Sequence, residues 1–147
     1  NRFIPLPSNK DQNHEKKAPS TEVVSYAKQY ENFLVDLFLQ YDDIKTFFYE
    51  NKMSEKEKQQ AIRRVDNMIE LVEKMDKERA PKPFQDLKAF HNTLLIELKM
   101  LHEALRNFTP NDKKNAQLAR LYFENIVSYH KSMQLEYRIT TSELGIF

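Results

Sequence analysis

The chain has 147 residues, of which 31% are charged and 40% hydrophobic, a composition typical of one soluble globular domain. Its net charge of +1, from 23 basic and 22 acidic residues, gives no electrostatic reason to bind nucleic acid. The absence of cysteine excludes disulfides, cysteine nucleophiles and thiolate metal sites. A single glycine, Gly145, is too few for the many turns of a β or α/β fold, so the composition favours helices.

The first segment, residues 1–19, reads NRFIPLPSNKDQNHEKKAP and contains three prolines without any apolar periodicity. We expect it to form an irregular linker or arm. An alternative is that Phe3, Ile4 and Leu6 dock on another surface, because they are apolar for an inert spacer.

The expected location of the protein follows from its first residue, which is Asn1 and not methionine. We expect a processed or truncated product, with a signal peptide, a lipid-bearing cysteine or an anchoring helix upstream. The chain itself has no run of 18 apolar residues that would predict a membrane span. The usage of Lys, Asn, Phe and Ile suggests a bacterial protein. An extracytoplasmic lipoprotein or exported protein is therefore expected, with a cytoplasmic location as the alternative.

The first helix is predicted over residues 21–51, with Ser20 as its N-cap. Its apolar residues recur at spacings of four and three, the heptad pattern of a coiled coil or a helix in a bundle. This stripe contains Val23, Ala27, Tyr30, Leu34, Leu37, Tyr41, Ile44 and Phe48.

The second helix is predicted over residues 55–79 because Ser54 and Glu57 have the spacing of a capping box. Its stripe contains Ala61, Val65, Met68, Val72 and Met75. The prolines at 81 and 83 end the helix. A third helix is predicted over residues 84–107, with a stripe of Phe84, Leu87, His91, Leu94, Leu98, Leu101 and Leu105.

The fourth helix is predicted over residues 110–138, with Thr109 as N-cap and Pro110 at the first helical position. Its stripe contains Ala116, Ala119, Phe123, Ile126, His130, Met133 and Tyr137. Residues 139–147 lose the pattern and are expected to form a short C-terminal tail. Short connections make successive helices antiparallel. The sequence therefore predicts an all-α fold, an up-down-up-down four-helix bundle over residues 20–138.

Histidine takes the place of a large apolar residue in two of the stripes. Antiparallel pairing predicts that Tyr30, Met75, His91 and His130 share the end of the core that holds both chain ends. Each histidine could be structural, bonded to a tyrosine hydroxyl or a backbone carbonyl, or could belong to a ligand pocket or a pH-sensitive contact.

We predict no metal, no cofactor and no catalytic residues. A di-iron bundle needs glutamate three residues before each histidine, but these positions hold Lys88 and Val127. Zinc usually takes three or four protein ligands. The sequence also lacks a Gly-rich phosphate loop, a Gly-x-Ser-x-Gly motif and an Asp-rich calcium loop.

A partner surface is predicted from polar and aromatic residues outside the stripes. Tyrosine offers contact area with a polar tip, and the neighbouring aspartates make one face acidic, although a simply solvated face is the alternative. The candidates are Tyr26, Tyr49, Tyr122, Tyr129, Asp42 and Asp43.

These patterns favour a non-catalytic module that binds a protein partner or has a structural role. The heptads also permit a homodimer as well as a monomer, because such stripes can pack between chains. The alternatives are a small-ligand sensor domain and a cofactor- or metal-binding bundle at His91 and His130.

Overall fold

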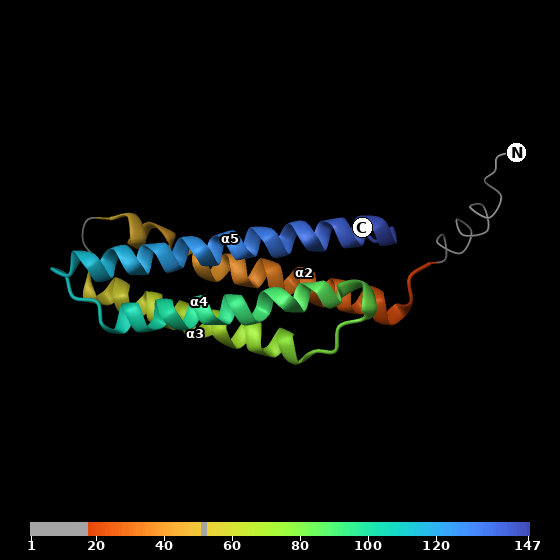
Figure 1. Cartoon of the computed structure of the whole chain (residues 1–147), viewed down its shortest axis with the longest axis horizontal. Helices are drawn as coiled ribbons and strands as arrows, with labels where there is room; N and C mark the ends of the chain where they lie inside the picture. Colours follow the sequence, from red (N-terminus) through yellow and green to blue (C-terminus); the bar gives the residue numbers. More distant parts are fainter. Residues whose placement is uncertain (1–17, 51–52) are drawn as a thin grey trace, which may run out of the picture.

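A computed structural model describes residues 18–50 and 53–147 of the chain. Four long helices lie side by side along one axis (Figure 1): α2 (Thr21–Asp42), α3 (Glu55–Lys77), α4 (Lys88–Arg106) and α5 (Lys113–Leu144). Two 3-10 helices, η1 (Lys45–Tyr49) and η2 (Lys82–Leu87), lie in the connections. Successive helices run antiparallel and α5 also contacts α2, so the predicted all-α four-helix bundle is confirmed.

The core consists of the four apolar stripes. All of the predicted stripe residues are buried except Val23 and Ala116, which are half-buried. Four leucines of α4 are among the fully buried side chains, and burying each contributes about 1.5–3 kcal/mol relative to exposure. Most of the predicted arm, including Phe3, Ile4 and Leu6, lies outside the described residues.

The first predicted helix is shorter than expected, because α2 ends at Asp42 and the chain continues through a turn into η1. The apolar stripe nevertheless continues across the break, with Ile44 and Phe48 buried. Ile44, Thr46 and the aromatic residues of this segment are weak helix formers, so tertiary packing selects the backbone geometry. The Phe48 ring stacks on Phe123 with centroids 4.4 Å apart.

The starts of the last two helices also differ from prediction. The third predicted helix begins as η2, whose Pro83 fits a first turn, and becomes α-helical at Lys88. The fourth begins at Lys113, and its N-cap is Asp112, whose Oδ1 accepts from the Asn115 N–H at 3.0 Å. Thr109 is therefore not the N-cap, because the aspartate carboxylate is a strong acceptor at a helix start.

The predicted C-terminal tail is mostly helical, since α5 continues to Leu144. Thr140 and Thr141 are buried, and Thr141 donates its hydroxyl to the Tyr137 carbonyl at 2.9 Å. Burial thus outweighs the weak helix propensity of these β-branched residues. The helix ends where Gly145 takes a φ of 71°, and the Ile146 N–H then donates to the Thr141 carbonyl at 2.9 Å.

The predicted capping box is present at the N-terminus of α3 and can be tested directly. The Ser54 hydroxyl accepts from the Glu57 N–H at 3.1 Å, and the Glu57 side chain accepts from the Ser54 N–H at 2.9 Å. We expect Ser54→Ala to lower the free energy of unfolding by about 1 kcal/mol in urea titrations. Ser132→Ala, at an exposed position inside α5, is the matched control and should not destabilise the chain. Equal effects of the two changes would contradict the capping role.

Candidate functional site

His91 is buried without exposed surface and forms a hydrogen bond at each ring nitrogen. The Asp76 carboxylate can only accept, so Nδ1 of His91 donates to Asp76 Oδ1 at 2.9 Å. Nε2 then accepts from the Tyr30 hydroxyl at 2.9 Å. Burial lowers the pKa of His91, although the bond to Asp76 opposes this shift. Burial also raises the pKa of Tyr30 far above its usual value.

His130 is also buried, with the opposite tautomer. Its Nε2 donates to the backbone carbonyl of Leu34 at 2.8 Å, because a carbonyl can only accept. Its Nδ1 accepts from the Tyr41 hydroxyl at 3.0 Å. Burial lowers the pKa of His130, partly opposed by the bond to Leu34, and burial raises the pKa of Tyr41 to about 12.

The two histidines lie at neighbouring levels of the bundle but in separate networks. Their partners on α2, Tyr30 and Leu34, are about 6 Å apart along the helix axis. Met75 is buried on α3 next to Asp76, the partner of His91. His91 lies in the first turn of α4, whereas His130 lies near the middle of α5. The start of α4 is at the end of the bundle where α2 begins and α5 finishes (Figure 1).

The hydrogen bonds leave neither ring with a free nitrogen. A metal ion at His91 or His130 would have to displace Tyr30, Tyr41 or another partner. Within residues 18–50 and 53–147, no three His, Asp or Glu side chains gather as a metal-binding group. The arrangement is that of structural histidines in a polar, satisfied part of the core.

A groove of about 700 Å³ lies between α2 and α5, close to His130. These two helices contact each other less closely than the other neighbouring long helices do. Tyr137 donates to the Ala27 carbonyl at 2.7 Å, and His130 bonds to the Leu34 carbonyl. These long side chains reach across to the α2 backbone and keep the helix axes apart.

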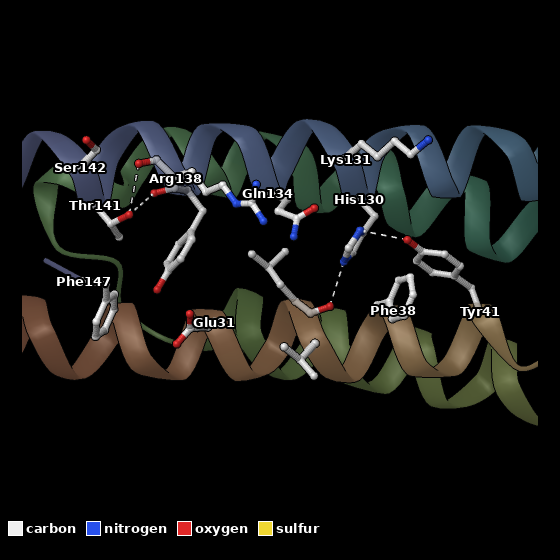
Figure 2. Close-up of a pocket in the computed structure, with 13 residues that line it drawn as sticks. Glu31, Phe38, Tyr41, His130, Lys131, Gln134, Arg138, Thr141, Ser142 and Phe147 are labelled. Atoms are coloured by element: carbon white, nitrogen blue, oxygen red, sulfur yellow. Dashed lines mark hydrogen bonds between the residues drawn. The ribbon is translucent and has the colours of Figure 1, made fainter.

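The groove is lined by apolar and charged side chains together. Figure 2 shows His130 and Tyr41 towards one end and Phe147 towards the other. The lining residues are Glu31, Leu34, Val35, Phe38, Tyr41, His130, Lys131, Gln134, Tyr137, Arg138, Thr141, Ser142 and Phe147. The predicted stripes and partner candidates include neither Val35 nor Phe38, so the sequence did not predict this surface.

Three large apolar residues that line the groove are exposed: Val35, Phe38 and Phe147. Val35 and Phe38 are 51% and 42% exposed, although they line it. On the same two helices Leu39, Leu135 and Ile139 are exposed as well. Leu39 lines a separate groove against α3. We call the residues that line the groove between α2 and α5 the α2–α5 face. The groove therefore combines a concave shape with exposed apolar side chains.

The charges of the groove are unpaired. Glu31 on α2 is its one acidic residue, and Lys131 and Arg138 on α5 are its basic residues. Among the described residues, none of the three forms an ion pair within 4.0 Å. Their charges are therefore available to a binding partner.

The tyrosines predicted to face a partner are mostly engaged within the chain. Tyr26 is 4% exposed and packs on Phe84 in the core, so its assignment to a partner surface was wrong. Tyr122 and Tyr129 are half-buried against the core. Tyr49 is exposed, but other side chains cover part of it. Its hydroxyl donates to Glu124 at 3.2 Å, and the Arg120 guanidinium lies 4.3 Å from its ring centroid.

The predicted acidic candidates also have partners in the chain. Asp42 pairs with Lys45 at 3.5 Å, and Asp43 pairs with Arg64 at 2.9 Å. Hydrogen bonds from Gln60 and Arg64 lower the pKa of Asp43. This acidic pair thus connects α2 to η1 and α3.

Comparison of the chain with known protein families, with curated proteins and with solved structures gave no match.

The Tyr30–His91 bond should contribute measurably to stability. We expect Tyr30→Phe to lower the free energy of unfolding by about 1–3 kcal/mol, because it leaves buried Nε2 of His91 without a donor. Tyr49→Phe, which removes an exposed hydroxyl, should cost less than about 1 kcal/mol. Urea unfolding of the two variants compares them, and equal losses would contradict the buried network.

The lowered pKa values of both buried histidines predict how stability depends on pH. Below the ordinary histidine pKa of about 6.5, the unfolded chain binds more protons than the folded chain. The stability that the two neutral histidines contribute is therefore fully present above about pH 6.5. It is lost as the pH falls through their lower pKa values in the folded chain. We expect lower urea midpoints in mildly acidic than in neutral buffer. Ring titrations by NMR that gave folded pKa values above 6.5 would contradict this prediction.

Proposed function

We propose that this chain is a non-catalytic helical module that binds another protein molecule through the α2–α5 face. The observation that carries the proposal is a groove between two helices whose lining includes the exposed apolar side chains of Val35, Phe38 and Phe147. Exposed apolar residues of α4, such as Ile96 and Met100, line neither this groove nor the one against α3.

The spacing of the groove residues favours a helical partner. On α2, Glu31, Val35 and Phe38 follow each other at intervals of four and three residues. On α5, Lys131, Gln134 and Arg138 follow at three and four. Such ridges are what a helix packs against, as when an amphipathic helix occupies a groove.

The titratable groups near the groove support a non-catalytic role. Tyr41 and His130 bond to each other, and burial disfavours the charged form of each. Glu31 has no second carboxylate beside it in the groove with which to form an acid–base pair. The groove thus supplies surface and charge for binding.

A small-ligand sensor is the second candidate, because the groove volume of about 700 Å³ falls in the usual range of ligand sites. We rank it below protein binding because the nearest buried polar atoms already have partners in the chain. A cofactor-binding bundle ranks lower again, because both ring nitrogens of His91 are already bonded to Tyr30 and Asp76.

The exported or membrane-anchored location stays a prediction. None of the helices in the two described ranges is long and apolar enough to cross a membrane. Fractionation of the native cells would test the location independently of the binding role.

Site-specific photo-crosslinking tests the protein-binding role. We expect a photoreactive residue at Val35 to form a covalent adduct with one protein in native cells, and Phe38→Asp to abolish that adduct. Ile96, which is 61% exposed on α4, is the matched control position outside the α2–α5 face. Equal labelling from Val35 and Ile96, or none from either, would contradict the proposal.

A further inference from the structure

We infer that the protein bound by the α2–α5 face is a second copy of this chain, related by a twofold axis parallel to the bundle. The inference rests on the proposed binding role of that face and names its partner. It is carried by the separation of charge between the two helices that form the groove.

The two helices carry opposite net charge. α2 contains four acidic residues and one basic residue, a net charge of −3, whereas α5 contains five basic and three acidic residues, a net charge of +2. The groove repeats this asymmetry, with Glu31 on the α2 side and Lys131 and Arg138 on the α5 side. A face with one negative and one positive helix complements itself when α2 of each copy meets α5 of the other.

The direction of the symmetry axis decides which helices meet. With the axis parallel to the bundle, α2 of the second copy lies antiparallel to α5 of the first, at an unchanged height along the bundle. With the axis across the bundle, α2 meets α2 and Glu31 faces the same acidic helix. Like charges in contact are unfavourable, so the charge pattern selects the parallel axis.

The internal register then predicts the contacts. Ala27 lies level with Tyr137, and Leu34 lies level with His130, as their hydrogen bonds show. Glu31 is thus level with residue 133. In the dimer, Glu31 of the second copy would lie between the heights of Lys131 and Arg138, within reach of both long side chains.

Exposed apolar residues flank this charged level along the axis. Val35 and Phe38 follow Glu31 on α2 and lie on one side of it. Leu135 and Ile139 on α5 extend to the other side. The interface would therefore have apolar contacts on both sides of the ion pairs, and would remove from water the side chains that the single chain leaves exposed.

The experiment measures the dimer dissociation constant by sedimentation velocity, with circular dichroism to show that each variant keeps its helix content. We expect the wild-type chain to dimerise. Glu31→Lys should weaken the dimer at least about tenfold. The twofold symmetry places the substitution in both copies, so it removes two equivalent contacts. Lys131→Glu with Arg138→Glu should weaken it similarly. Glu73→Lys, at an exposed position on α3, is the matched control and should leave the dissociation constant unchanged.

Mixing the two variants gives the decisive result. In the Glu31→Lys variant, position 31 and the α5 positions 131 and 138 are all positively charged. In the Lys131→Glu, Arg138→Glu variant, the same three positions are all negatively charged. Each should dimerise poorly alone, and the mixture should form a heterodimer close to wild-type affinity. Glu31→Gln separates the axis directions, since it weakens the parallel-axis dimer and strengthens one in which α2 meets α2.

A chain that stays monomeric at every concentration, or a dimer that is insensitive to Glu31→Lys, overturns the inference. The proposed binding role survives that result if Val35 still crosslinks to a different protein. Loss of every adduct at Val35 overturns both.

Discussion

Two buried tyrosine–histidine bonds hold the bundle in register. Tyr30 and Tyr41 on α2 bond to His91 on α4 and His130 on α5, at 2.9 and 3.0 Å. Burying a polar ring in an apolar stripe costs free energy unless each ring nitrogen has a hydrogen-bond partner. Only one alignment of the helices brings all of these partners to the two histidines. The polar groups therefore specify the alignment that the leucines alone would leave less defined.

The same choice of side chains produces the groove. At the contact between α2 and α5, Tyr137 and His130 span to the carbonyls of Ala27 and Leu34. Small side chains would let the helices approach and close this side of the bundle. Long hydrogen-bonding side chains instead hold the helices apart and leave Val35 and Phe38 partly exposed. The groove is thus a consequence of the hydrogen bonds that satisfy the polar groups of the core.

The fold could be predicted from the sequence because each long helix carries a largely apolar stripe at heptad spacing and α3 carries a capping box. The helix ends were less predictable, since packing at Phe48 and burial of Thr140 outweigh local propensity. The histidines could be identified as core residues, but their partner Asp76 could not. It lies off the stripes, and only the folded chain brings it to His91. The groove was missed because heptad patterns describe which faces are buried and do not give the distance between two helices.

The floor of the groove links the buried polar groups to the surface that would bind a partner. His130 and Tyr41 line the groove and are also bonded to each other. A protein that covers the α2–α5 face would further exclude water from this pair, which strengthens the bond and increases the cost of protonating His130. Binding and the neutral state of His130 should therefore support each other. A face that associates at neutral pH would accordingly lose affinity as the histidine becomes charged, without any other change in the bundle.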